Sequence, residues 1–210
     1  MKSGDSSSTE VKSQHEAGPS AIEKAIARFG TPQERDYCLI VRRDAFEERC
    51  RKRGQRAAEV VFLVCRPGGK FLLHTKSFYP PGAYRVLTGG IEEGEDLVAA
   101  IFREAREETG LEVSIERFLG ILHYRFCWND QETDFTSYVF LLKKRGGRLA
   151  PQDSSERITG YKEVTLDEFP EIARKLEETL PQDWKAWGQF RALAHRFAFE
   201  ELTVGSRSSG

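Results

Sequence analysis

The sequence is poor in cysteine: only four of its 210 residues are cysteines, and they stand far apart. No two of them form the Cys-x-x-Cys pair that commonly holds zinc or exchanges electrons, which argues against both kinds of site. A chain of this length with so few cysteines is typical of a reducing compartment, so we expect a cytoplasmic protein. The thiols themselves are expected to be small buried or unreactive side chains.

Long apolar runs and an excess of one charge are also missing. No apolar run approaches the roughly 20 residues that a membrane-spanning helix needs, and residues 1–19 lack the apolar segment of a signal peptide. The formal net charge of −1 gives no basic field that would attract duplex nucleic acid or a membrane surface. We therefore expect neither as a partner.

The composition, with 39% hydrophobic and 31% charged residues, suits a globular protein with a real core. We expect one domain over residues 20–203, with disordered tails over 1–19 and 204–210. Several neighbouring strands, such as those of the hairpin expected over 58–76, are joined by turns too short for a parallel crossover. This pattern predicts an α/β fold with a mixed sheet, an N-terminal helical lead-in and a C-terminal helix.

The segment "REAREETG", residues 103–110, ends an expected helix with the wrong charges. At helical spacing, Glu104 and Glu108 continue the apolar row that Leu97 begins, and Glu107 lies beside them. Carboxylates about 6 Å apart repel by roughly 3 kcal/mol at an effective dielectric constant of about 20, and the helix dipole disfavours them further. A divalent cation removes this repulsion, and converging oxygen ligands suit Mg²⁺ shared with substrate phosphates. The alternative is a solvated acidic helix face.

A wider spacing pattern distinguishes these alternatives. The pattern G-x5-E-x7-R-E-U-x-E-E-x-G-U, in which U is aliphatic, is met in order by Gly89, Glu95, Arg103, Glu104, Ala105, Glu107, Glu108, Gly110 and Leu111. A chance match is on the order of one in a million for a chain of this length. The pattern is the Nudix box, and the chain therefore resembles the Nudix hydrolases.

The resemblance implies a fold, a reaction and a cofactor. The fold is an α/β/α sandwich, with the mixed sheet between helices. The reaction is the hydrolysis of a diphosphate linkage in a small nucleoside diphosphate-X substrate, by attack of water at phosphorus, with Mg²⁺ or Mn²⁺ as cofactor. The expected metal ligands are the side chains of Glu104, Glu107 and Glu108 and the carbonyl of Thr88. Thr88 departs from the family pattern, which usually has glycine there.

The resemblance also assigns roles in positioning and proton transfer. The expected structural residues of the loop and helix are Gly89, Gly90, Glu95 and Gly110. Arg103 is expected to orient the glutamates, and Glu95 to hold the loop against the helix. The glycines would let the loop pass close to metal or phosphate. The general base is expected to be either Glu107 of the box or Glu156, which lies in a loop before the closing strand.

Few residues point to the substrate. In "GAYRVLTGG", Tyr84 stands where the family usually has tryptophan, and we expect Tyr84 and Arg85 to contact the substrate. Trp128 is the third expected contact; it shares an aromatic face with two other residues of 123–128, for which core packing is the alternative to base stacking. The family's ADP-ribose hydrolases usually carry a proline shortly after the box, whereas none occurs here before Pro151.

A second aromatic stripe occurs near helical spacing in the C-terminal segment. Its members are Trp184, Trp187, Phe190, Ala194 and Phe197. Such a stripe is typical of a helix face packed into the core, and the alternative is a contact in a homodimer.

Two other functions are compatible with the resemblance. One is a non-catalytic Nudix-like domain that senses nucleotides; such domains often lose acidic residues of the box, whereas this chain keeps them all. The other is an isomerase of isoprenyl diphosphates on the same fold, for which the sequence shows no specific cysteine and glutamate setting. A metal-dependent pyrophosphohydrolase is therefore the leading hypothesis.

Overall fold

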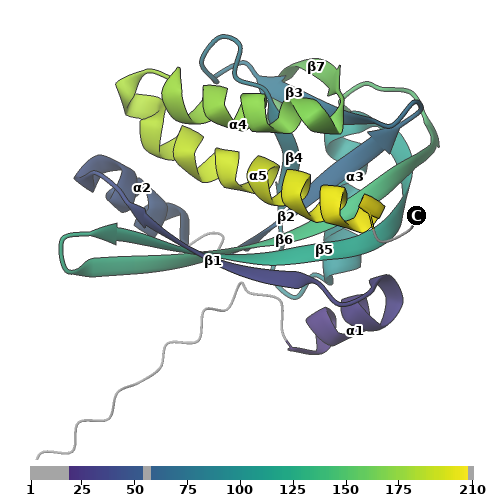
Figure 1. The fold of residues 1–210 in the computed structure, drawn as a ribbon, viewed down its shortest axis with the longest axis horizontal. Coiled ribbons are helices and arrows are strands. Elements are labelled where there is room, and N and C mark those ends of the chain that lie inside the picture. Colours follow the sequence, from purple (N-terminus) through teal and green to yellow (C-terminus); the bar gives the residue numbers. More distant parts are fainter. Residues whose placement is uncertain (1–18, 54–57, 208–210) are drawn as a thin grey trace, which may run out of the picture.

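The computed structural model describes residues 19–53 and 58–207 (Figure 1). Within these ranges, seven strands form one sheet in the order β1-β5-β6-β2-β4-β3-β7. The strands are β1 (Gln33–Ile40), β2 (Ala58–Arg66), β3 (Lys70–Lys76), β4 (Arg85–Gly90), β5 (Leu111–Trp128), β6 (Gln131–Gly147) and β7 (Ile158–Val164). The pairs β1–β5 and β2–β6 are parallel and the others are antiparallel. The expected mixed sheet is confirmed.

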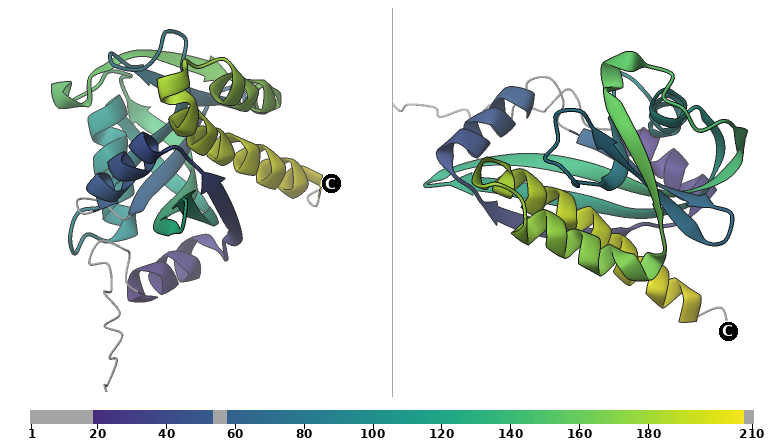
Figure 2. Two further views of the ribbon diagram at one scale, coloured as in Figure 1. Left: turned by 90° about the vertical axis from the view of Figure 1, so that its left-hand side faces the viewer. Right: turned by 90° about the horizontal axis from the view of Figure 1, so that it is seen from above.

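Helices cover both faces of this sheet (Figure 2). The helices are α1 (Pro19–Phe29), α2 (Arg43–Arg53), α3 (Leu97–Thr109), α4 (Phe169–Glu178) and α5 (Lys185–Arg207). Strand β2 is buried on both faces, as in a sheet between two helical layers. Val60 and Phe62 pack in one core with α1 and α3, whereas Val61 and Leu63 pack in another with α2, α4 and α5. The expected α/β/α sandwich is confirmed.

The C-terminal helix is longer than expected. Helix α5 continues to Arg207, beyond residue 203, at which the expected domain ends. The buried side chain of Leu202 anchors this end of the helix to the core. Residues 1–18 and 208–210, which belong to the expected tails, lie outside the described residues. None of the helices in the described ranges combines the length and apolar character needed to span a bilayer.

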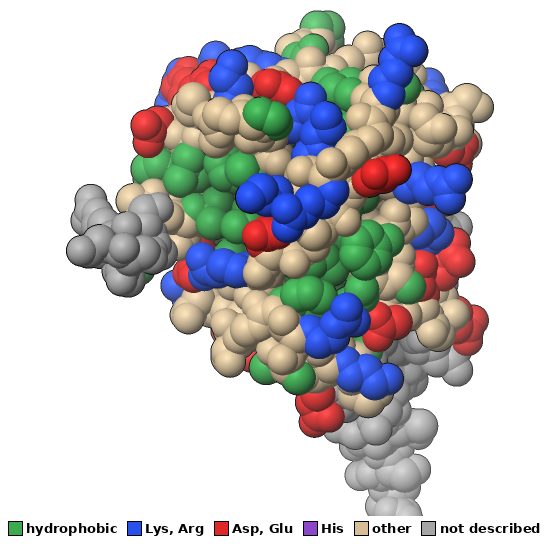
Figure 3. Space-filling model, turned by 90° about the vertical axis from the view of Figure 1, so that its right-hand side faces the viewer, with side chains coloured by type: hydrophobic (Ala, Val, Ile, Leu, Met, Phe, Trp, Pro, Cys, Tyr) green, Lys and Arg blue, Asp and Glu red, His purple; other side chains and the backbone are tan. Residues whose placement is uncertain are grey.

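Charges of both signs are interspersed on the surface. The face seen in Figure 3 mixes acidic and basic side chains with apolar ones and carries no large patch of one sign. This agrees with the formal net charge of −1.

His195 of α5 joins this helix to β4 inside the core. Its Nε2 accepts a hydrogen bond from the Val86 amide at 3.2 Å, and its Nδ1 lies 3.0 Å from the Arg191 carbonyl oxygen, to which it donates. Burial lowers the pKa of His195 to about 4. The ring is therefore neutral in the folded protein at pH 7.

We expect this histidine to make folding less favourable as the pH falls from about 6.5 to about 4. The unfolded ring binds a proton in this range and the folded ring does not, so its stabilising contribution is complete above pH 6.5 and is lost toward pH 4. The loss is about 3 kcal/mol. Urea unfolding between pH 7 and pH 4 should show a shallower pH dependence for His195→Gln than for the wild type. Identical pH dependences would contradict this assignment.

Candidate active site

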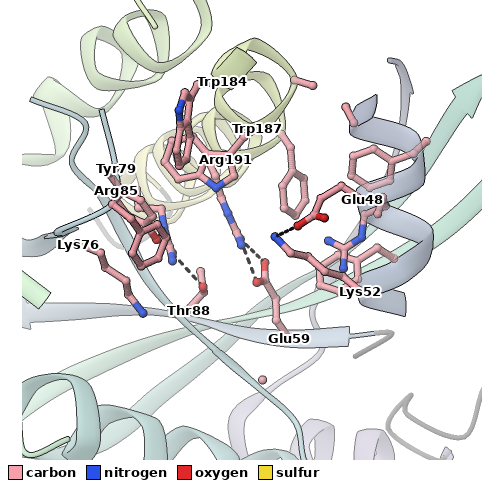
Figure 4. Close-up of a pocket in the computed structure, with 18 of the residues that line it drawn as sticks. Glu48, Lys52, Glu59, Lys76, Tyr79, Arg85, Thr88, Trp184, Trp187 and Arg191 are labelled. Carbon is pink, nitrogen blue, oxygen red and sulfur yellow. Dashed lines mark hydrogen bonds and ion pairs between the residues drawn. The ribbon is translucent and has the colours of Figure 1, made fainter. Parts of the chain in front are cut away.

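A cavity of about 620 Å³ lies between the sheet and the helices α2 and α5 (Figure 4). Strands β2 and β4 run along one side of it, and the two helices face them. Residues from β3, β4, α3 and the loop before β7 define one end, which we call the glutamate end: Lys76, Thr88, Gly89, Glu104 and Glu156. Several residues that the sequence marked as site residues meet here.

Arg103 of α3 ties the acidic residues to one another and to β4. Its Nε and Nη2 donate to the two carboxylate oxygens of Glu95 at 2.8 and 2.7 Å, and Nη2 also donates to the Gly90 carbonyl at 2.8 Å. Its Nη1 donates to Glu104 at 2.8 Å and to Glu107 at 3.2 Å. These contacts support the positioning roles proposed for Arg103 and Glu95.

Helix α3, which carries the glutamates, has a capping residue at each end. The Asp96 side chain caps its first turn, and Gly110, in the left-handed conformation with φ 66°, ends it. Beyond the helix end, the backbone N–H of Gln152 donates to the backbone carbonyl of Glu107 at 2.8 Å. This hydrogen bond satisfies one of the free carbonyls at the helix end. It also holds the loop with the short 3₁₀ helix η1 (Ser154–Glu156) beside the glutamates.

Glu104 packs directly against Gly89 of β4. Glu104 is only 4% exposed, and burial raises the pKa of its carboxyl although Arg103 opposes the shift. A Cβ atom on Gly89 would lie 1.9 Å from Cδ of Glu104, which is far closer than two non-bonded carbon atoms can approach. Gly89 therefore allows β4 and the Glu104 carboxylate to touch.

We expect Gly89→Ala to lower turnover at least tenfold, about 1.4 kcal/mol in activation free energy, while the protein still folds. The added methyl group must displace the Glu104 side chain from its place beside Arg103. The matched control is Gly160→Ala on β7, where the nearest atom to an added Cβ is Tyr84 Oη at 3.3 Å. Rates and melting curves of both variants make the comparison. Equal rates for the two would show that the position of Glu104 is unimportant.

Glu108 is a fully buried carboxylate with few donors around it. Lys76 Nζ lies 3.0 Å from Glu108 Oε1 and also donates to Glu156, and His74 Nδ1 lies 3.9 Å from the same Oε1. Within the described ranges, neither Glu108 oxygen has a hydrogen bond of good geometry. Burial raises the pKa of Glu108 to about 8, against the opposing effect of the Lys76 ammonium. Such a carboxylate is suited to accept a further cation.

The donor set is suited to a hard divalent cation. Glu104, Glu107 and Glu108 offer only oxygen ligands, as Mg²⁺ prefers. In the part of the chain that the structure describes, no three acidic, histidine or cysteine side chains converge closely enough to hold an ion. Arg103 and Lys76 instead contact the carboxylates. Metal binding would therefore replace some of these contacts with cation–oxygen contacts.

Of the three expected substrate contacts, Arg85 lines the cavity. Arg85 is 3% exposed, and its Nε donates to the Tyr79 hydroxyl at 2.9 Å while its Nη1 donates to Thr88 Oγ1 at 2.9 Å. Thr88 lies in β4 beside Gly89, at the glutamate end. The role of the Thr88 carbonyl as a metal ligand stays a prediction.

Tyr84 and Trp128 lie outside the lining of this cavity. The Trp128 ring packs against Phe46 of α2 with ring centroids 6.1 Å apart, and the Arg43 guanidinium lies 5.5 Å from the Trp128 ring centroid. Tyr124, on the same face of β5, is buried in the core. The structure thus favours the core-packing alternative for Tyr124 and Trp128, whereas Phe126, the third member of this face, lines the cavity.

The side of the cavity next to the start of α5 is aromatic, and Tyr79 lies beside Lys76 there (Figure 4). We call the three rings that line it the aromatic end: Tyr79 from the loop after β3, Trp184 of the short 3₁₀ helix η3 (Gln182–Trp184), and Trp187 of α5. In the rest of the expected stripe, Ala194 and Phe197 are buried in the core, which confirms core packing for them. The two tryptophans share the spacing of the stripe and yet line the cavity.

Helix α2 supplies a wall that the sequence did not indicate. Its lining residues include Asp44, Ala45, Glu48, Arg49 and Lys52. The Arg49 guanidinium lies 4.0 Å from the Phe135 ring centroid, and burial lowers the pKa of Arg49 to about 10. From α5, Arg191 donates to both carboxylate oxygens of Glu59, at 2.7 and 2.9 Å. These contacts join residues far apart in sequence, so no local spacing could have revealed them.

Comparison with known proteins adds a family match. A family model described as "NUDIX domain" matches residues 55–186. The chain is 32% identical over 127 residues to the "NAD-capped RNA hydrolase NudC" of Vibrio atlanticus, a match that covers 59% of this chain and 45% of that protein. It is 29% identical over 125 residues to the "ADP-ribose pyrophosphatase" of Methanocaldococcus jannaschii, covering 59% of this chain and 70% of that protein.

A solved structure described as "Crystal structure of UDP-X diphosphatase" matches with a TM-score of 0.43 and 19% sequence identity, covering 59% of this chain and 60% of that one. The chain spans less than half the length of two NudC relatives that it matches, 45% and 47%. Helix α2 and nearly all of α5, which wall the cavity, lie outside the matched residues 55–186.

Proposed function

Because the chain belongs to the Nudix family, we propose that it hydrolyses a diphosphate linkage in a nucleoside diphosphate derivative, with a divalent metal ion. The observation that carries the proposal is the glutamate end of the cavity. Next to that end, Arg103 holds Glu104 and Glu107 together, and the buried Glu108 carboxylate, 3.0 Å from the Lys76 ammonium, has no hydrogen bond of good geometry among the described residues. Carboxylates in this state at the edge of a cavity are suited to binding metal together with phosphate.

The residues at and next to the glutamate end divide the work of the reaction. Glu104, Glu107 and Glu108 would hold Mg²⁺ or Mn²⁺, which supplies charge neutralisation for the diphosphate and activation of the attacking water. Lys76 and Arg85 bring positive charge to the phosphate oxygens. Water attacks one phosphorus, the bridging P–O bond breaks, and the departing phosphate carries away the bond's electron pair.

The proton of the attacking water requires a nearby base. Glu107 and Glu156 are the two candidates: Glu107 is partly exposed beside Glu104, and Glu156 lies at the glutamate end. Glu156 accepts a hydrogen bond from Lys76. This hydrogen bond would have to break before Glu156 could accept a proton from water.

A non-catalytic sensor is the second candidate function. The observation that favours it is the Lys76 ammonium, which already supplies a positive charge to Glu108 and Glu156. A sensor would bind the nucleotide in this cavity and release it unchanged.

The two candidates differ in a screen of nucleoside diphosphate derivatives, including ADP-ribose, NADH, UDP-sugars and NAD-capped RNA, with Mg²⁺ or Mn²⁺. Mass spectrometry identifies phosphate-containing products. We expect cleavage at the diphosphate, complete loss of cleavage in EDTA, and recovery when the metal is restored. Turnover that survives exhaustive chelation would contradict metal dependence, and tight binding without any product would establish the sensor.

A further inference from the structure

The wall that α2 and α5 give the cavity contains a guanidinium without an ionic partner. Arg49 of α2 lines the cavity and is half-buried. Within residues 19–53 and 58–207, Arg49 makes no ion pair, and its Nε has no hydrogen-bond partner. The Phe135 ring contacts the guanidinium but accepts none of the N–H bonds in the plane of that group. A half-buried charge with unused donors is unfavourable, and a bound anion would relieve it.

The acidic side chains on this wall already contact other cations. Glu48 of α2 contacts the Lys52 ammonium at 2.9 Å (Figure 4). Asp44 and Asp183, which also line the cavity, both contact the Arg42 guanidinium. None of these three carboxylates is therefore left to pair with a further cation of the wall.

The one remaining carboxylate of this wall, that of Glu59, serves Arg191. A single nitrogen of Arg191, Nη1, donates to both oxygens of Glu59, and the Arg191 Nε has no hydrogen-bond partner among the described residues. Burial lowers the pKa of Arg49, the Glu59 carboxylate opposes this shift, and the Arg191 guanidinium adds to it. The two guanidiniums thus lie near one carboxylate, which compensates only one of their two positive charges.

This pair of guanidiniums lies next to the glutamate end. In the antiparallel pairing of β2 with β4, Glu59 is opposite Gly90, the residue after Gly89. Gly89 is the glycine against which Glu104 packs. Neighbouring strands are only about 5 Å apart. An anion held by Arg49 would therefore lie beside a diphosphate at the glutamate end, in the same cavity, so one sugar ring could carry both groups.

We propose that Arg49 and Arg191 bind a phosphate group that is not part of the diphosphate linkage. The inference rests on the proposed function, because it places the diphosphate at the glutamate end. It selects nucleoside diphosphate derivatives with a further phosphate on the ribose, at the 2′ or the 3′ hydroxyl. A guanidinium binds phosphate oxygens through paired N–H donors, and such charge-assisted hydrogen bonds are strong. Both arginines lie outside residues 55–186, so the subsite is additional to the part that the family model matches.

Calorimetric titration in the presence of Mg²⁺ tests the subsite with AMP, adenosine 2′,5′-bisphosphate and adenosine 3′,5′-bisphosphate. None of these probes contains a diphosphate, so the proposed reaction cannot consume them. The wild type should bind at least one bisphosphate at least tenfold more tightly than AMP, about 1.4 kcal/mol. The two bisphosphates differ only in the hydroxyl that carries the phosphate, so the tighter one identifies its position on the ribose.

Variants of α2 then assign the preference to Arg49. Arg49→Gln should weaken binding of the tighter bisphosphate at least tenfold and change AMP binding less than about twofold. Arg49→Met, which keeps the apolar stem against Phe135, should show the same loss, and it also serves if the glutamine variant fails to fold. The matched control is Arg43→Gln on the same helix, where the exposed Arg43 pairs with Glu47 at 2.7 Å. This control should keep the wild-type affinities.

Each outcome decides for or against the phosphate subsite. Equal affinity of the wild type for AMP and both bisphosphates would overturn it, as would a preference that survives both Arg49 variants. Equal weakening of AMP and bisphosphate binding in these variants would show a structural role for Arg49 and overturn it too. Loss of the preference alone, in a protein that cleaves no diphosphate, would keep the subsite and overturn the proposed hydrolysis.

Discussion

Replacing Glu108 with glutamine is expected to lower turnover about a thousandfold or more and to leave the metal-free protein at least as stable as the wild type. Loss of one metal ligand removes several kcal/mol of charge stabilisation in the transition state, which corresponds to a rate factor of this size. The stability follows from the same position, because Glu108 is a fully buried carboxylate without a well-formed hydrogen bond to any residue that the structure describes. Glutamine keeps its size and is uncharged, as is the protonated carboxyl that burial favours at neutral pH.

Paired melting curves with and without Mg²⁺ test this prediction, together with a rate on an accepted substrate. The wild type should gain stability from metal and ligand, because both bind only the folded state. Glu108→Gln should lose most of that gain, whereas the exposed control Glu112→Gln should keep it. Destabilisation of metal-free Glu108→Gln by several kcal/mol would instead make Glu108 a structural partner of Lys76.

Replacing Lys76 with methionine is expected to change metal affinity and metal-free stability in opposite directions. The Lys76 ammonium is 10% exposed and contacts both Glu108 and Glu156. Without it, the metal-free protein should lose on the order of 3 kcal/mol, because a buried carboxylate loses its ion-pair partner. Because the ammonium no longer competes for these oxygens, the affinity for Mn²⁺ should rise at least tenfold, about 1.4 kcal/mol.

Calorimetric titration with Mn²⁺ and urea unfolding without metal measure the two effects of Lys76→Met. Lys76→Arg, which keeps the positive charge, is the matched control and should resemble the wild type in both measurements. Unchanged Mn²⁺ affinity in Lys76→Met would mean that the ammonium and the metal do not compete for the same carboxylates.

The sequence predicted the parts of the site that lie close together along the chain. The spacing of Glu104, Glu107 and Glu108 lies within one helix, and the cap at Asp96 and the glycine at Gly110 limit where that helix can begin and end. Short turns between strands were enough to predict a mixed sheet, because they exclude parallel crossovers. These features depend on local geometry, which one sequence shows directly.

The rest of the site depends on contacts between distant segments. Lys76 is the last residue of β3, and nothing near it in the sequence indicates that its side chain will contact Glu108. Trp184 and Trp187 have the same helical spacing as the buried Phe197, so periodicity could not separate cavity lining from core. Trp128, an expected substrate contact, packs against Phe46 and Arg43 of α2, and nothing near Trp128 in the sequence indicates these contacts. Tertiary packing decides each of these cases.

The cavity is lined partly by residues that the family model matches and partly by residues outside that match. The glutamate end belongs to residues 55–186, which the family model matches, whereas α2 and nearly all of α5 lie outside that range and wall the other side. Substitution of the residues of α2 and α5 that face the cavity therefore leaves every member of the acidic cluster in place. For protein engineering, the residues of α2 and α5 that face the cavity are therefore the positions to vary when a new substrate preference is wanted. Strand β4 and helix α3 would be kept unchanged.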